Sequence, residues 1–321
     1  MAQATPGALD GLVAGVRAGD VRAVARAISL VEDARPEARP LLAALFPHAG
    51  GSLVVGVTGP PGAGKSSLVD RLTAHLRRQG KTVGIVAVDP TSPFSGGAIL
   101  GDRIRMQAHA TDPGVFIRSM ATRGHLGGLA AATDQALTVL SAAGKDVVLV
   151  ETVGVGQDEV DIVGTADVSV VVLVPGLGDE VQALKAGIME IADVFVVNKA
   201  DRDGVERVVA EIESMLSLAA SDGPPPAVVK TVATRDEGID RLLEAVEAFR
   251  LRASASGALA RKRRAQLRRQ LEDAVRQRVM GHVFRQVVAP EELEETVERM
   301  AGRAVDPFTA ADAIVERMGL P

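Results

Sequence analysis

A phosphate-binding motif stands near the start of the chain, directly after a run of apolar residues. Its pattern, G-x-x-x-x-G-K-[ST], lets backbone N–H groups of a glycine-rich loop converge on phosphate oxygens. The motif lysine reaches the β- and γ-phosphates of a nucleotide, and the hydroxyl after it coordinates Mg²⁺. The sequence therefore predicts a nucleotide-binding loop that consists of Gly59, Pro60, Pro61, Gly62, Ala63, Gly64, Lys65, Ser66 and Ser67.

A second motif, N-K-A-D at 198–201, could distinguish one base from another. The Asp201 carboxylate can accept both N1–H and the 2-amino group of guanine, whereas adenine would leave that charge unpaired. We expect Asn198 to tie this loop to the phosphate loop and the Lys199 stem to cover the base. The last apolar run ends with Thr231, Val232 and Ala233. At this position a small residue would offer its backbone N–H to guanine O6.

Carboxylates suited to Mg²⁺ follow two further apolar runs. Glu151 ends one run and is the expected metal-side carboxylate; a γ-phosphate could hold the N–H of Gly154, so that hydrolysis would release that loop. Asp89 ends another run, and together with Asp102 it brackets a stretch rich in Ser and Gly. Both aspartates are candidates for the metal's water shell and the attacking water. Arg105 follows, either facing the phosphates or solvated.

Alternating strands and helices must position these residues. Continuous apolar runs predict buried strands at 52–59, 82–89, 115–118, 146–151, 168–174, 194–198 and 227–233. Helical segments lie between most of them, at 65–79, 124–143, 179–191 and 203–219. This alternation predicts an α/β fold with a mostly parallel sheet covered on both faces, with ligands beyond the carboxyl ends of the strands.

The two ends of the chain are predicted to be helical. Short helices over 8–48 precede the sheet, and no strand-like run follows Phe249, so we expect a helical extension at 1–48, a nucleotide-binding domain at 49–248 and a helical segment at 249–321. Asp306 before Pro307 marks a helix start. An apolar stripe, which is either internal core or a dimer seam, is formed by Leu267, Leu271, Val275, Val279 and Val283.

The composition excludes several classes of protein. The 321 residues include no Cys, which rules out disulfides, thiolate metal sites and cysteine nucleophiles and is consistent with a reducing, cytoplasmic environment. The net charge of −5 gives no global reason to expect nucleic acid or a membrane as a partner. We find no signal peptide and no apolar run near the roughly 20 residues that a membrane span needs.

Four stretches together resemble the MeaB/ArgK-type P-loop GTPases, which accompany adenosylcobalamin-dependent acyl-CoA mutases. They are GPPGAGKSSL, VDPTSPFSGGAILGDRIRM, ETVGVGQDEVD and NKAD. The resemblance implies Mg²⁺-dependent hydrolysis of GTP to GDP, a homodimer built partly by the C-terminal helices, and a chaperone that gates cofactor loading and protects the mutase. It also implies that Asp179 and Lys185, in a stretch similar to the family's third switch loop, communicate with the mutase.

One departure concerns the attacking water. Ras-like proteins place a water-orienting Gln directly after the glycine equivalent to Gly154, but here Val155 follows and Gln157 is displaced. We therefore expect slow intrinsic hydrolysis that a partner stimulates.

Three other functions fit the sequence less well. A nickel or cobalt metallochaperone usually has a Cys/His delivery cluster, whereas this chain has no Cys and its five His are scattered. A transport-protein kinase would need an acceptor site, and the sequence shows none. The basic tract RKRRAQLRRQ at 261–270 could bind nucleic acid, but it is more simply a solvated helix face or a partner for the acidic helix at 291–298, within one chain or across a dimer. Which acyl-CoA mutase is the client stays open.

Overall fold

The computed structural model describes residues 6–89, 109–121, 128–152, 164–176, 192–218 and 224–317. The chain divides into two compact units, 1–266 and 267–321. The first unit holds the sheet, and the second is helical. The boundaries at 48 and 248 that the sequence suggests stay predictions.

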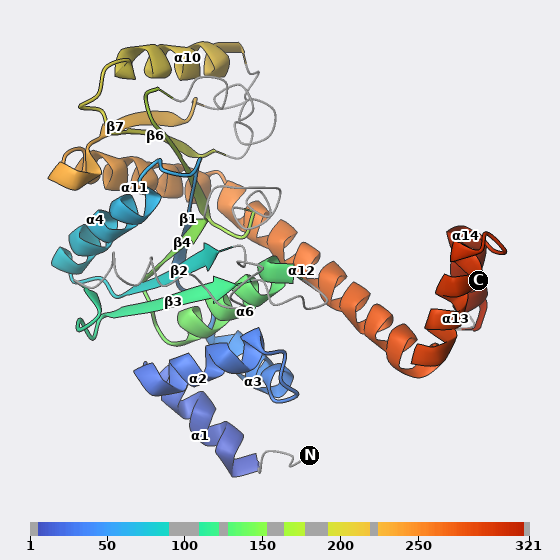
Figure 1. Cartoon of the computed structure of the whole chain (residues 1–321). Coiled ribbons are helices and arrows are strands. Elements are labelled where there is room, and N and C mark those ends of the chain that lie inside the picture. The colour runs from blue at the N-terminus through green and yellow to red at the C-terminus, as the bar shows by residue number, and fades with distance from the viewer. Residues whose placement is uncertain are drawn as a thin grey trace. The chain divides into compact units, whose positions relative to one another are not determined.

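Seven strands form one sheet in the order β3-β2-β4-β1-β5-β6-β7 (Figure 1). Every neighbouring pair is parallel. The strands are β1 Leu53–Thr58, β2 Val83–Asp89, β3 Val115–Ala121, β4 Val147–Thr152, β5 Val168–Leu173, β6 Val194–Asn198 and β7 Ala227–Thr231. The seven predicted strands and the parallel α/β sheet are therefore confirmed.

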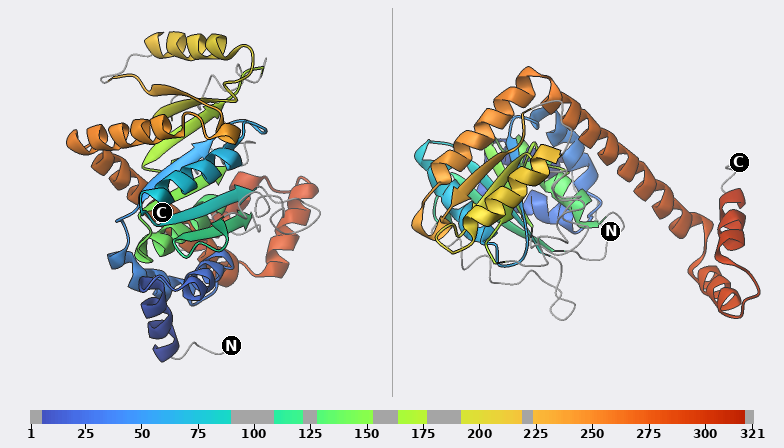
Figure 2. Two further views of the ribbon diagram at one scale, coloured as in Figure 1. Left: turned by 90° about the vertical axis from the view of Figure 1, so that its left-hand side faces the viewer. Right: turned by 90° about the horizontal axis from the view of Figure 1, so that it is seen from above.

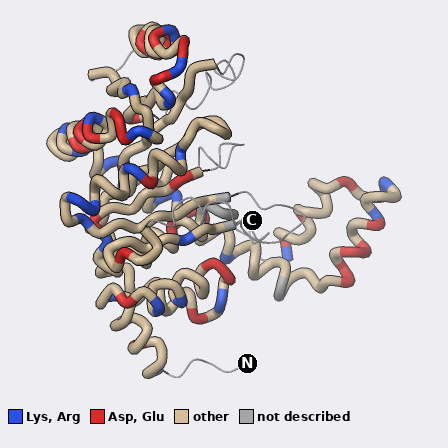
Figure 3. Tube along the Cα trace, turned by 60° about the vertical axis from the view of Figure 1, so that its left-hand side comes forward, with Lys and Arg blue, Asp and Glu red and all other residues tan. Residues whose placement is uncertain are grey.

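Helices cover both faces of the sheet, because side chains of each strand alternate between the faces. On one face pack α4 (Lys65–Arg78) and α11 (Ile239–Ala255), as Figures 1 and 2 show. On the other face lie α6 (Gly128–Ala142) and α10 (Val205–Leu218). Most charged residues lie on the helices and loops, whereas the strands consist mainly of uncharged residues (Figure 3). The predicted helix at 179–191 lies outside the described residues.

Three N-terminal helices extend the second face: α1 Pro6–Arg17, α2 Val21–Glu32 and α3 Ala38–Leu45, followed by the 3₁₀ turn η1 Phe46–His48. Their apolar side chains join the cluster formed by α6, β2 and β4. Asp20 caps α2 by accepting a hydrogen bond from the Ala23 N–H (2.7 Å). Arg118 of β3 donates to the buried Glu32 carboxylate and so joins α2 to the edge of the sheet.

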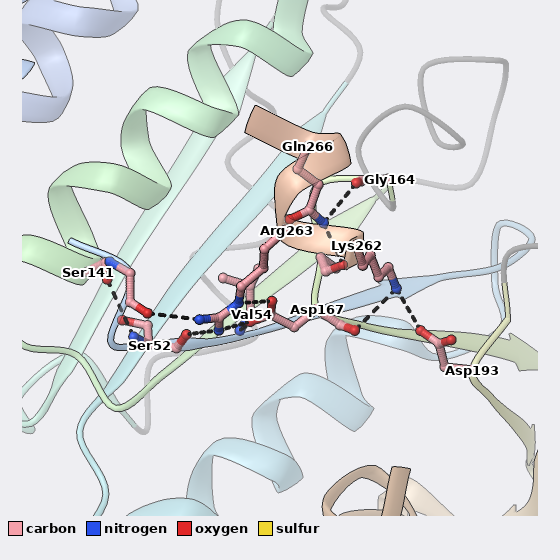
Figure 4. Close-up of polar contacts among 11 residues, drawn as sticks. Ser52, Val54, Ser141, Gly164, Asp167, Asp193, Lys262, Arg263 and Gln266 are labelled. Carbon is pink, nitrogen blue, oxygen red and sulfur yellow. Dashed lines mark hydrogen bonds and ion pairs between the residues drawn. The ribbon is translucent and has the colours of Figure 1, made fainter. Parts of the chain in front are cut away.

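The start of α12 (Ala258–His282) is fixed to the amino ends of three strands by polar contacts (Figure 4). Arg263 donates two hydrogen bonds of 2.7 Å to the buried Asp167 carboxylate. Lys262 donates to Asp193 (2.9 Å), and the Gln266 amide donates to the Ala166 carbonyl (2.9 Å). These two basic side chains therefore pair with acids at the starts of strands, and the predicted pairing of the basic tract with the acidic helix at 291–298 stays a prediction.

The second unit comprises the rest of α12 and three further helical elements. These are the π-helical turn η4 Val283–Val287, then α13 Pro290–Ala301 and α14 Pro307–Arg317. The predicted helix start is confirmed, because Asp306 accepts from the N–H groups of Phe308 and Thr309. Val283 is buried, but the rest of the apolar stripe is exposed: Leu267, Leu271, Val275 and Val279. The hypothesis that these four residues form an internal core is therefore wrong.

None of the helices in the described ranges combines the length and apolar character that crossing a membrane requires.

Candidate nucleotide site

The phosphate-binding loop connects β1 to α4 through glycines in left-handed backbone conformations. Gly59 has φ +143°, and a Cβ there would come within 2.1 Å of the Val172 carbonyl oxygen. Gly64 has φ +87°, and a Cβ there would meet the Asn198 amide nitrogen at 2.5 Å. Both positions therefore require glycine, because a side chain would strain the backbone and displace a neighbouring element.

Lys65 begins α4 and turns its side chain back over the loop. Its buried ammonium group donates to the carbonyls of Gly59 (2.6 Å) and Pro60 (3.0 Å). The helix N-terminus adds the positive end of its dipole at the same place. These features give the loop the positive charge and N–H donors that bind phosphate groups.

Ser66 and Glu151 meet beside the loop. The Ser66 hydroxyl donates to the Glu151 carboxylate at 2.5 Å, and both side chains are buried. They come together because β1 and β4 are neighbours, with Val57 in register with Glu151. A hydroxyl and a carboxylate are the hard oxygen ligands that Mg²⁺ accepts, so this pair fits a metal at the phosphate end. No group of three His, Cys, Asp or Glu side chains within the described ranges could hold a metal by itself.

Asp89 ends β2 at the same edge of the sheet, one residue beyond the pair that Val88 makes with Thr152. Nothing is described of its side chain. The other predicted residues of the switch loops lie outside the described residues: Asp102, Arg105, Gly154, Asp179 and Lys185.

Asn198 joins the second motif to the phosphate loop, as the sequence predicts. Its buried side-chain amide donates to the Ala63 carbonyl (2.8 Å). Its side-chain oxygen accepts from the Thr231 hydroxyl (3.1 Å) and from the Ala233 N–H (3.2 Å). One side chain thus holds three segments together at the carboxyl ends of β1, β6 and β7. The predicted contact of the Ala233 N–H with guanine O6 stays a prediction.

Lys199 and Asp201 follow Asn198 on the exposed side of the loop. Lys199 has φ +57°, and its ammonium group donates to the Gly62 carbonyl (2.6 Å), so its stem spans the phosphate loop. The Asp201 carboxylate, 33% exposed, forms an ion pair with Arg235 (3.2 Å). The Asp201 carboxylate is therefore partly exposed, and its Oδ2 lies beside a cation.

Arg235 is a contact that the sequence analysis missed. It ends the 3₁₀ turn η3, Ala233–Arg235, directly after β7. No motif marks it, because its pairing with Asp201 depends on β6 and β7 lying side by side in the sheet. The described site therefore contains the phosphate loop, Ser66 with Glu151, and the two loops at 198–201 and 231–235.

Comparison with known proteins gives a consistent result. The family model for the methylmalonyl-CoA mutase-associated GTPase MeaB matches residues 24–288. A Pyrococcus abyssi protein whose name designates a GTPase is 50% identical and covers 97% of each chain. GTPase ArgK of Escherichia coli is 38% identical over 84% of each chain.

Two further similarities extend over nearly the whole chain. The mouse methylmalonic aciduria type A homolog, a mitochondrial protein, is 34% identical over 96% of this chain and 79% of its own. The crystal structure of an LAO/AO transport system kinase superposes with a TM-score of 0.73 at 28% identity, and covers 99% of this chain and 100% of its own. The similarity thus includes the whole sheet and both nucleotide-site motifs.

Proposed function

The chain is a P-loop GTPase of the MeaB family, and from that premise we propose that it is a chaperone of an adenosylcobalamin-dependent acyl-CoA mutase. In this role GTP hydrolysis gates loading of the cofactor and protects the mutase from inactivation. The client we propose is methylmalonyl-CoA mutase. The observation that carries the proposal is the family match over 24–288, because the nucleotide site alone would suit many GTPases.

Within the site we propose that the phosphate loop binds the phosphates of GTP and GDP, and that Asp201 reads guanine. Lys65 would neutralise negative charge on the β- and γ-phosphates. Ser66 and Glu151 would hold Mg²⁺, which supplies positive charge where negative charge develops on the phosphate oxygens. Asn198 supports this assignment, since it fixes the base loop and the phosphate loop in one geometry.

The switch residues complete the proposal from the sequence. Asp89 and Asp102 are assigned to the metal's water shell and the attacking water, Arg105 to the phosphates, and Gly154 to the γ-phosphate. Asp179 and Lys185 are assigned to communication with the mutase.

We also propose a homodimer through the C-terminal helices. The exposed apolar stripe from Leu267 to Val279 supports it, because a helix face of this kind is stabilised when a partner covers it. Nucleic-acid binding is the less favoured alternative. Two side chains of the basic tract, Lys262 and Arg263, already form ion pairs with Asp193 and Asp167.

The chaperone role is tested by the lifetime of the mutase. Purified methylmalonyl-CoA mutase is allowed to turn over with this protein in the presence of GTP, of GDP, or of no nucleotide, and its residual activity is followed. We expect slower inactivation that depends on the nucleotide. Identical inactivation with and without the protein would exclude protection of this client.

A further inference from the structure

His75 of α4 makes contacts that the phosphate and base motifs do not explain. Its side chain is 8% exposed, and each ring nitrogen faces a carboxylate. Nδ1 lies 2.6 Å from Asp240 of α11, and Nε2 lies 2.9 Å from Asp236. Both ring nitrogens therefore lie within hydrogen-bond distance of a carboxylate oxygen. The buried ring thus joins α4 to Asp236 and to the start of α11.

Asp236 is the C-cap residue that directly follows the turn η3. Burial opposes its ionisation, but the hydrogen bond and charge of His75 and those of Arg78 outweigh burial and lower the pKa of Asp236. Its backbone has φ +61°, a left-handed conformation that glycine adopts with less strain. The Asp236 carboxylate thus lies where the backbone reverses direction, and its contact with His75 holds the turn in place.

The residues of η3 contact both parts of the base loop. The Ala233 N–H donates to Asn198, and Arg235 pairs with Asp201. Behind the turn, Val232 and Glu237 bond to each other through their backbones. Moving Asp236 would therefore displace the groups that lie against the proposed guanine position.

The helix that supplies His75 also begins with Lys65 and Ser66. Ten residues separate Lys65 from His75, so the two lie about 15 Å apart along the helix axis. We propose that His75 is a positioning residue for guanine: through Asp236 it holds η3 in the geometry that reads the base, in fixed relation to the phosphate loop. This rests on the guanine site proposed above.

Nucleotide binding by Asp236→Gly and His75→Gln tests the proposal. Glycine suits the left-handed backbone, so Asp236→Gly is expected to fold while losing the contact to His75. We expect both variants to bind GDP about five- to tenfold more weakly, the size expected for loss of about one ordinary hydrogen bond. Binding of inorganic tripolyphosphate, which has no base, should stay unchanged. Asp236→Asn, which keeps an acceptor oxygen, should restore most of the GDP affinity.

Asp240→Asn is the matched control. It changes the other carboxylate of His75 but leaves Asp236 and η3 in place, so we expect GDP affinity within about twofold of the original protein. Folded His75 and Asp236 variants with unchanged GDP affinity would overturn the proposal. An equal loss of GDP and tripolyphosphate binding would also overturn it, because His75 would then support the fold as a whole.

Failure of the guanine site itself is recognised separately. If Asp201→Asn leaves the preference for guanine over xanthine unchanged, the base assignment fails. If that variant changes the preference but the His75 and Asp236 variants bind GDP normally, only the positioning role fails.

Discussion

Asn198 connects two loops that we expect to bind opposite ends of a nucleotide. Its amide donates to the phosphate loop, and its oxygen accepts from the segment after β7. A buried side chain that satisfies three backbone or hydroxyl partners is sensitive to any change of geometry. At the scale of single residues, we therefore expect substitutions at the phosphate end and at the base end to have distinct effects on nucleotide binding.

At the phosphate end, Lys65→Ala should weaken GTP binding by at least about a hundredfold, because a charge-assisted contact to the phosphates is lost. The measurement is titration with a fluorescent GTP analogue. Lys230→Ala is the matched control, since Lys230 is an exposed lysine of β7 that pairs with Glu206. If Lys65→Ala retains full affinity, the loop is not the nucleotide site.

At the base end, Asp201→Asn should exchange guanine for xanthine. The asparagine amide can donate to the xanthine 2-oxo group, whereas it cannot accept both guanine donors, so GDP should bind about ten- to a hundredfold more weakly. Competition between GDP and xanthosine diphosphate measures the shift. Asp203→Asn is the matched control, because Asp203 is an exposed aspartate of the same loop. An unchanged preference for GDP would remove Asp201 from the base site.

At the scale of elements, α4 is also anchored at its far end. Arg77 donates two hydrogen bonds to Asp112 (2.8 and 2.9 Å), just before β3. These bonds from Arg77, with one from the Gly114 N–H, lower the pKa of Asp112 below its usual 3.8. The ionised carboxylate therefore stabilises the fold fully above that usual value, and the contribution disappears as the pH falls through the lowered pKa.

This linkage is measurable by urea unfolding of the original protein and Asp112→Asn between about pH 6 and pH 2.5. We expect the original protein to be more stable at pH 6 and the difference to vanish toward the acidic end. A difference that stays constant over the whole range would show that the Asp112 charge is not involved.

The elements themselves were largely predictable from the sequence. Parallel strands buried on both faces are continuous apolar runs, so β4 and β5 were recognisable from their composition. The two motifs were recognisable because each depends on fixed spacing within one loop. The contacts of His75 and Arg235 were not predictable, because their partners lie 161 and 34 residues away in the sequence. No local sequence pattern indicates that the segment around η3 packs against α4.

The apolar stripe of α12 shows a second limit. Its four-residue spacing correctly indicated a helix, but the same spacing suits an internal core and an intermolecular seam. Because the stripe from Leu267 to Val279 is exposed in the structure, these residues do not form an internal core.

At the scale of the whole molecule, the start of α12 is held to the sheet by Arg263. Hydrogen bonding to Asp167 raises the pKa of Arg263, which remains a cation. Arg263→Met would leave the buried Asp167 carboxylate without its ion pair, and we expect a loss of about 2–3 kcal/mol in the free energy of unfolding, since Arg263 is partly exposed.

Urea unfolding checks this loss, with Arg264→Met as the control because Arg264 is an exposed neighbour. A change below about 0.5 kcal/mol, the usual range for surface substitutions, would show that the contact does not contribute to stability.

The most direct test of the central claim is GTP hydrolysis measured with and without purified adenosylcobalamin-dependent methylmalonyl-CoA mutase, with ATP as the control nucleotide. We expect slow turnover of GTP that the mutase accelerates, and little turnover of ATP. GTP turnover that the mutase leaves unchanged would contradict the proposed partnership.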